Sequence, residues 1–237
     1  MGKHQHVSRM AMPESWPLPR KGTKWIAKPD PGTHSLETSM PVIVYLRDIL
    51  QVVQVARIAK KILNAGEILI NGKTVRDLNF PVGVFDTLAI PKTGKFYRVV
   101  LDSNGKLRLL EIPQAEAKLT PVKIVGKKTM KKGKLEINLS NGWNMLAGKE
   151  SYKIDDVLLI DTAQKKPVKH FKLEEGCTVY VIGGQHVGKV ATFKGVRQAG
   201  ISRKEKLAII ESGKEKWETS LDKVFPIGFG KPEIKVE

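Results

Sequence analysis

The sequence predicts a multidomain α+β protein in which helices are confined to one segment and short strands fill most of the rest. Helical periodicity occurs only in the stretch just after residue 43, short apolar runs bounded by glycine recur beyond it, and the first 42 residues are rich in proline. We divide the chain into an extended basic arm (1–42), a helix and hairpin module (43–108), a β-rich central domain (109–172), and a small β-barrel domain with a C-terminal tail (173–237).

The charge balance points to a polyanionic partner. The 237 residues include 41 Lys and Arg against 24 Asp and Glu, which gives a formal net charge of +17, and each of the four parts is net positive. Nucleic acid is the first candidate and an anionic membrane surface the second. A basic surface that only confers solubility is the alternative, although +17 exceeds what solubility requires of small domains.

The sequence gives no sign of secretion or of a membrane span. Cys177 is the single cysteine, so no intramolecular disulfide can form, which fits a reducing compartment. The N-terminus has no apolar signal region, and no run of 18 apolar residues occurs. We therefore expect no membrane association, and we expect Cys177 to be a small core residue of a strand.

The arm carries five prolines between Met12 and His34, with Trp16 and Trp25 as isolated large side chains. Proline removes amide donors and interrupts helices and strands. Such a segment does not build its own core, so we expect it to be disordered in the free protein and ordered against a large partner.

The second part begins with two helical stretches, IVYLRDIL and VQVARIAKKILNAG. On a helical wheel the second stretch has an apolar side and a basic side, and Gly66 is placed to stop the helix. The apolar side comprises Val55, Ile58, Ala59, Ile62 and Leu63, and the basic side comprises Arg57, Lys60, Lys61 and Asn64.

The segment ILINGKTV, which follows the second helix, predicts a hairpin. Asn71-Gly72 is a strong signal for a two-residue turn, because both residues tolerate positive φ. Lys73 and Arg76 follow the turn. Together with the basic side of the helix they form a compact positive surface suited to phosphate contacts, whereas the helix alone would be read as an ordinary solvated one.

The central part consists of short strand-like runs and one lysine cluster. GKKTMKKGK predicts a flexible basic loop, in which lysine serves as a point charge for phosphate. A merely solvated loop is the alternative. The candidate RNA-binding residues of this loop are Lys127, Lys128, Lys131 and Lys132.

The last part contains VIGGQHVGKV, in which Gly183, Gly188 and Lys189 match the spacing of a phosphate-binding P-loop. Val190 stands where that loop needs Ser or Thr to hold Mg²⁺, and the following residues indicate a strand rather than a helix. We therefore expect a hairpin in which Gly183, Gly184 and Gly188 are turn residues and Lys189 is a candidate RNA contact.

Four stretches resemble segments of known families. ARIAKKILNAGEILINGKTV resembles the S-four-type RNA-binding module, although Val55 and Ala56 stand where the module usually opens with Ser-Arg. VIGGQHVGKV resembles the KOW motif, with Gly188 at the turn glycine of an SH3-like barrel. KPDPGTH and RDLNFPVG complete an order of segments that resembles the S-four-e family of small-subunit ribosomal proteins, in its archaeal form.

This resemblance implies binding to small-subunit rRNA, neighbouring ribosomal proteins as partners, and a cytoplasmic location on the ribosome. It implies no enzyme activity, no cofactor, no small-molecule substrate and no homo-oligomer. An RNA-modifying enzyme is one rival, but Asp155, Asp156 and Asp161 lie in a strand-like run without a paired His or Cys, and no metal-ligand spacing occurs. A free RNA-binding or transcription factor is the second rival.

Overall fold

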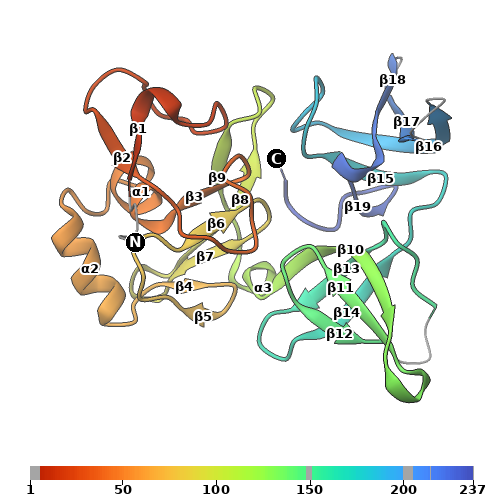
Figure 1. Cartoon of the computed structure of the whole chain (residues 1–237), viewed down its shortest axis with the longest axis horizontal. Helices are drawn as coiled ribbons and strands as arrows, with labels where there is room; N and C mark the ends of the chain where they lie inside the picture. The colour runs from red at the N-terminus through yellow and green to blue at the C-terminus, as the bar shows by residue number, and fades with distance from the viewer. Residues whose placement is uncertain (1–5, 148–150, 200–204, 214, 237) are drawn as a thin grey trace. The chain divides into compact units, whose positions relative to one another are not determined.

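The computed structural model of the chain describes residues 6–147, 151–199, 205–213 and 215–236. It divides into two compact units (Figure 1). Unit 1 holds the chain up to Asp102 together with Lys106–Thr120, and unit 2 holds Ser103–Gly105 and the chain from Pro121 onward. The domain boundaries expected at residues 42, 108 and 172 stay predictions.

Unit 1 is built on a five-stranded antiparallel sheet with two smaller strand pairs. The large sheet has the order β5-β4-β7-β8-β9, and the pairs are β1 with β2 and β3 with β6. The strands are β1 (His6–Ser8), β2 (Trp25–Ala27), β3 (Ser39–Pro41), β4 (Leu69–Ile70), β5 (Lys73–Thr74), β6 (Pro81–Gly83), β7 (Thr87–Ile90), β8 (Lys95–Leu101) and β9 (Leu107–Glu111).

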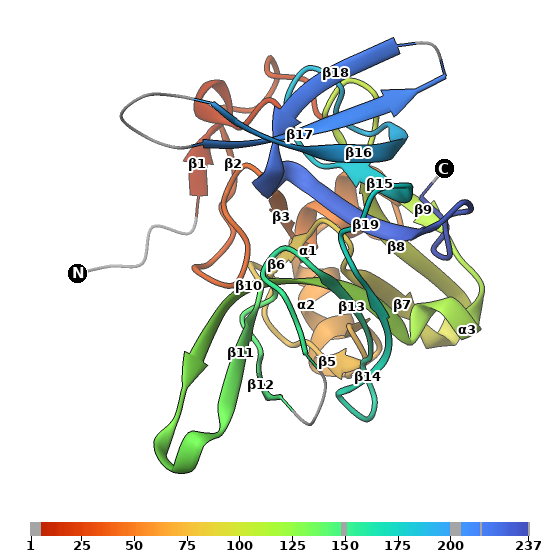
Figure 2. The ribbon, with the colours of Figure 1, turned by 90° about the vertical axis from the view of Figure 1, so that its right-hand side faces the viewer.

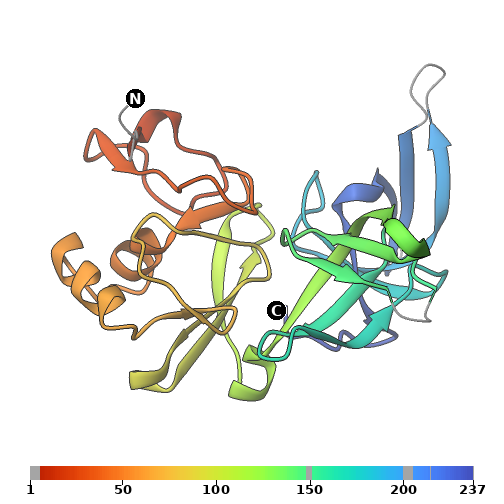
Figure 3. The same cartoon turned by 60° about the horizontal axis from the view of Figure 1, so that its bottom comes forward.

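The helices of unit 1 are short. They are η1 (Arg9–Ala11), α1 (Val42–Val44), η2 (Tyr45–Ile49), α2 (Ala56–Asn64), η3 (Pro91–Thr93) and α3 (Gln114–Ala117). The two helical stretches expected after residue 42 are therefore confirmed. The first five residues of the α1–η2 segment, Val42 to Leu46, are hydrophobic and buried. Helix α2 lies at the edge of unit 1 (Figure 3).

The proline-rich arm is part of unit 1 and packs against its strands. Trp16 is only 1% exposed, and its indole N–H donates to the Ser39 carbonyl at 3.0 Å. The Ser15 carbonyl accepts a hydrogen bond from the Leu107 N–H at the start of β9. The expectation of a disordered arm is therefore wrong around Trp16, because this side chain completes a core that the arm alone could not form.

Unit 2 contains two five-stranded sheets. The first has the order β12-β11-β10-β13-β14 and packs a core that includes Ile124, Ile137 and Leu158. Its long β10–β11 hairpin projects from the rest of the sheet (Figure 2). The elements are β10 (Leu119–Thr129), η4 (Lys131–Gly133), β11 (Leu135–Leu139), β12 (Asn144–Leu146), β13 (Val157–Asp161) and β14 (Lys166–Phe171).

The second sheet of unit 2 has the order β18-β17-β16-β15-β19. Short apolar runs separated by glycine turns predict strands in this segment, and the structure has five of them. Cys177 is fully buried in its core beside Val179 and Phe193, and burial raises the pKa of the thiol to about 11. The elements are β15 (Cys177–Val181), β16 (Val190–Ala199), β17 (Glu205–Ser212), β18 (Glu215–Ser220), η5 (Leu221–Lys223) and β19 (Val224–Phe229). The predicted multidomain α+β class, rich in strands, is confirmed.

Candidate nucleic-acid interface

The basic side of α2 faces solvent. Arg57, Lys60 and Lys61 are all exposed, whereas Ala59 and Leu63 are fully buried. Four residues separate Ala59 from Leu63, so both point to the same side of the helix. The helix is thus held through this narrow strip, and the three cations stay available for a partner.

The apolar side of α2 is narrower than the sequence predicts. Val55 and Ile58, which the helical wheel groups with Ala59 and Leu63, are 55% and 49% exposed, so only part of the predicted apolar side is buried. Val55 is the extended residue that precedes the helix, with φ of −123° and ψ of 138°. Ile58 lies in the first turn, beyond the strip through which Ala59 and Leu63 anchor the helix.

The end of α2 leads directly into the hairpin. Gly66 has a φ of 74° and its N–H donates to the Leu63 carbonyl, which is how a glycine stops a helix. A Cβ at Gly66 would lie 3.3 Å from the Thr74 methyl group of β5. The hairpin turn has φ of 48° at Asn71 and 73° at Gly72, as a two-residue turn of this hand requires.

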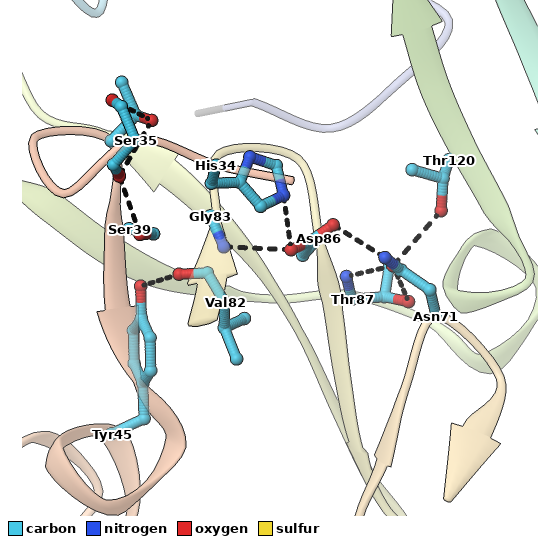
Figure 4. Close-up of polar contacts among 11 residues, drawn as sticks. His34, Ser35, Ser39, Tyr45, Asn71, Val82, Gly83, Asp86, Thr87 and Thr120 are labelled. Carbon is cyan, nitrogen blue, oxygen red and sulfur yellow. Dashed lines mark hydrogen bonds and ion pairs between the residues drawn. The ribbon is translucent and has the colours of Figure 1, made fainter. Parts of the chain in front are cut away.

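A polar network that the sequence analysis missed fixes this turn (Figure 4). The side-chain amide of Asn71 donates from Nδ2 to Asp86 at 2.6 Å, and its Oδ1 accepts the Thr87 N–H at 2.9 Å. The second Asp86 oxygen accepts the Gly83 N–H and lies 2.9 Å from the His34 ring. Asn71 directly follows β4 and Asp86 directly precedes its partner strand β7, and this pairing is not visible in the sequence.

The buried Asp86 carboxylate also sets the titration of its neighbours. Burial alone lowers the pKa of His34, but the hydrogen bond to Asp86 and its negative charge outweigh that effect, so the pKa is raised. Burial, reinforced by Asp86, raises the pKa of Tyr45 well above its usual value. The network therefore holds the Asn71-Gly72 turn of the hairpin from within unit 1.

The lysine cluster of unit 2 is a hairpin rather than the flexible loop that the sequence predicts. Lys127 and Lys128 lie on β10, where they pair with Ile137 and Glu136 of β11. Lys131 begins the short η4 turn, and all three side chains are exposed; the Lys132 side chain lies outside the described part of the chain. Strand pairing continues to Thr129 opposite Leu135, so only the tip remains as a loop.

The glycine-rich segment joins β15 to β16, as predicted, and no helix follows it. The Gly188 N–H donates to the Val181 carbonyl at 2.9 Å, and the Val181 N–H donates to the Lys189 carbonyl at 3.2 Å. Gly184 and Gly188 have φ of 97° and 78°. Gly183 lacks positive φ but lies close to the Lys223 side chain, and Lys189 is exposed.

The candidate RNA contacts are distributed over both units. Arg57, Lys60, Lys61, Lys73 and Arg76 belong to unit 1, and the end of α2 beside β5 brings their two elements together. The others belong to unit 2, on the β10–β11 hairpin and after Gly188.

The three carboxylates considered for catalysis form hydrogen bonds or ion pairs within unit 2. Asp156 is 1% exposed, lies 2.8 Å from the His170 ring and accepts two backbone N–H groups, so the statement that it lacks a paired histidine is wrong. Within the described ranges, no group of three or more His, Cys, Asp or Glu residues could hold a metal ion. No helix in the described part of the chain is long and apolar enough to span a membrane.

Comparison with known proteins gives matches along nearly the whole chain. Residues 93–167 match the ribosomal family S4e, residues 1–37 the RS4NT domain and residues 51–88 the S4 domain. Proteins named small ribosomal subunit protein eS4 are similar throughout. The one from Methanocella arvoryzae is 37% identical over 97% of each chain, and the one from Aeropyrum pernix is 35% identical over 100% of this chain and 96% of its own.

A solved structure is similar as well. The crystal structure of the 30S ribosomal protein S4e from Thermoplasma acidophilum aligns with a TM-score of 0.70 and 26% identity, over 84% of this chain and 99% of that chain. The fold and the order of segments therefore agree with one family.

Proposed function

The chain belongs to ribosomal family S4e, and from this premise we propose that it is a structural constituent of the small ribosomal subunit that binds rRNA and supports subunit assembly and translation. The observation that carries this proposal is similarity over 97% of the chain to a protein named small ribosomal subunit protein eS4. The protein then works in the cytoplasm, as part of the ribosome.

The chemistry of the exposed residues supports binding through phosphate groups. Arg57, Lys60 and Lys61 project from one short helix, and Lys73 and Arg76 follow the neighbouring hairpin. Lysine offers point charges and arginine offers a planar fork of donors, and both suit phosphate oxygens. Such contacts position a protein on RNA without reading its sequence.

The basic hairpin of unit 2 extends the proposed contact. Lys127, Lys128 and Lys131 are exposed along β10 and at its tip, and Lys189 is exposed after the Gly188 turn. A hairpin is stiffer than the loop expected from the sequence, so its cations lose less conformational entropy when RNA binds. Neighbouring ribosomal proteins are the other partners, and we propose one copy per subunit without a small-molecule substrate or a catalytic role.

Fractionation tests the proposal against the free-factor alternative. The tagged chain, expressed in an archaeal host, is sedimented with ribosomal subunits through gradients of increasing salt. We expect it to remain with the small subunit at moderate salt, as an integral component does. A chain that leaves the subunit at moderate salt, while core ribosomal proteins stay, would show that it is a dissociable factor.

A further inference from the structure

One of the two tryptophans of the N-terminal arm is exposed. Trp25 is 51% exposed, whereas Trp16 of the same arm is 1% exposed. Trp25 begins β2 opposite Ser8 of β1, and the next residue, Ile26, is buried at 3%. Because strand residues alternate in direction, the register that buries Ile26 turns Trp25 outward.

The exposed indole has a defined setting. The His6 ring meets it edge to face, with centroids 4.9 Å apart and an angle of 71° between the planes. The Lys24 ammonium lies 5.4 Å from the centroid of the indole. The T-shaped contact with His6 therefore restricts the orientation of the indole, and a flexible cation lies within reach of its face.

The surroundings of Trp25 are positive. Residues 6–28 contain Arg9, Arg20, Lys21, Lys24 and Lys28 and only one acid, Glu14. Two of these cations are held by backbone: Arg9 donates to the Pro19 carbonyl at 3.0 Å and Arg20 to the Met10 carbonyl at 3.2 Å. The Arg9 N–H also donates to the Lys24 carbonyl, which ties the loop to the start of β2.

We propose that Trp25 is a stacking platform for an unpaired base of RNA, with Lys24 and its neighbouring cations contacting the flanking phosphates. This inference rests on the proposed function and deepens it. An exposed aromatic face beside cations is the arrangement with which proteins bind single strands, because every base has a π-face and every linkage a phosphate. Lys24 can leave the ring for a phosphate without any backbone movement, since its side chain is long and exposed.

The platform adds a selectivity that the basic surfaces lack. Cations on α2 and on the β10–β11 hairpin favour any RNA, paired or unpaired, because phosphates are present in both. A base inside a duplex is already stacked on both faces and is not free to stack on an indole. Trp25 therefore favours a loop, a bulge or a strand end.

The test compares RNA binding by the full chain and two variants, W25A and W25F. The probes are a 12-nucleotide oligouridylate and a fully paired RNA duplex, each titrated at the same ionic strength. We expect W25A to bind the oligouridylate roughly 5- to 100-fold more weakly, as loss of one base-aromatic stack implies. Its affinity for the duplex should change less than about twofold, since the phosphate contacts remain.

The conservative variant and fluorescence separate stacking from a structural effect. W25F keeps an aromatic face and should recover most of the oligouridylate affinity. In the native chain the oligouridylate should quench tryptophan emission, and in W25F this quenching should be lost although RNA still binds. Thermal melts of both variants verify that unit 1 is intact.

Three outcomes are informative. If the native chain and W25A bind both probes with equal affinity, the stacking role of Trp25 is refuted while the proposed function stands. If W25A retains oligouridylate binding but leaves the small subunit in gradients, Trp25 contacts a protein neighbour and the inference is wrong. If the native chain binds neither probe, the proposed function itself fails.

Discussion

At the scale of single residues, each unit contains a buried aspartate whose carboxylate bonds to residues from separate segments of the chain. Asp86 in unit 1 accepts the Gly83 N–H and lies 2.9 Å from the His34 ring. Asp156 in unit 2 lies 2.8 Å from the His170 ring and accepts the N–H groups of two loop residues. A buried carboxylate is costly unless every oxygen is bonded, so these residues fix the loops around them.

The His34–Asp86 pair makes stability depend on pH. Because the folded-state pKa of His34 is raised, its contribution is fully present below the unfolded value of about 6.5 and is lost as pH rises through the folded pKa. We expect the free energy of unfolding to fall as pH increases through that range. H34Q, which keeps a neutral donor, should flatten the dependence, and chemical denaturation at several pH values measures it.

A control and a second variant accompany this test. H6Q removes an exposed imidazole that has no buried carboxylate partner, and it should leave the pH dependence as in the native chain. H34A should lower stability by about 1–3 kcal/mol at low pH and by less at high pH, because a buried Asp86 oxygen loses one of its partners, and this partner is charged only at low pH. An unchanged pH profile in H34Q would show that the pair does not govern stability.

The Gly188 turn predicts different melting temperatures for substitutions at two neighbouring residues. Gly188 has a φ of 78°, which a β-branched residue adopts at a cost of roughly 1–3 kcal/mol. G188V should therefore lower the melting temperature clearly, whereas K189A should leave it unchanged because Lys189 is exposed. A nucleotide site would reverse the importance of the two residues, and ATP binding that K189A abolishes would contradict the hairpin reading.

At the scale of elements, α2 is anchored by few residues and exposes its cations. K60E/K61E should weaken binding to an rRNA fragment by at least tenfold, since two contacts with phosphate become repulsive. The melting temperature should change little, because solvent-exposed charges contribute little to stability. Filter binding and thermal melts measure the two effects.

A matched control isolates position from net charge. Lys165 and Lys166 are exposed in unit 2 and are not candidate RNA contacts, and K165E/K166E changes the net charge by the same amount. We expect a smaller loss of affinity in this variant. If the two double variants lose affinity equally, only overall charge matters and the α2 surface is not a specific interface. If K60E/K61E unfolds, its basic side is structural.

Within unit 2, one lysine connects the two sheets. Lys123 of β10 is 5% exposed, and its ammonium donates to the carbonyls of Leu221 at 2.8 Å and Val224 at 3.2 Å. Burial lowers its pKa, while the Asp155 carboxylate at 3.1 Å favours the charged form. Strand β10 thus carries the solvent-exposed Lys127 and Lys128 and the buried Lys123, which a count of charges does not distinguish.

The sequence predicted those features that depend on residues close together in the chain, and it failed for those that depend on contacts between distant segments. The Asn71-Gly72 turn, the Gly66 helix stop and the Gly188 hairpin follow from φ preferences of the residues themselves, and the sequence was sufficient for their local structure. The burial of Trp16 and the exposure of Ile58 depend on what other segments cover. The His34–Asp86–Asn71 network joins residues far apart in sequence, so no pattern of spacing could predict it.

The candidate interface shows the same contrast between local and nonlocal features. Helical spacing was sufficient to group Arg57, Lys60 and Lys61 on one side of a helix. It could not show that Lys127 and Lys128 stand on a paired strand, because strand pairing with β11 is a nonlocal property. Direct contacts with RNA stay predictions for all of these residues.

At the scale of the whole molecule, the charge of +17 is carried by both units, and each presents exposed cations on its own elements. Two units on one chain that each bind the same RNA reinforce one another, because the second contact is intramolecular once the first has formed. This reinforcement needs no strong individual site. It fits an integral component of the small subunit rather than a factor that dissociates from it.

Binding dominated by phosphates has a measurable signature at this scale. Each phosphate neutralised on paired RNA contributes roughly −0.9 to the slope of log affinity against log salt, by analogy with duplex DNA. If the five cations of the unit 1 surface each contact one phosphate, the full chain should show a slope of about −4 or steeper. K60E/K61E should reduce the steepness by about 2, while W25A should leave the slope unchanged because an indole releases no counterion. A flat plot for the native chain would contradict the phosphate-directed mechanism, and an unchanged slope in K60E/K61E would place the RNA contacts elsewhere on the chain.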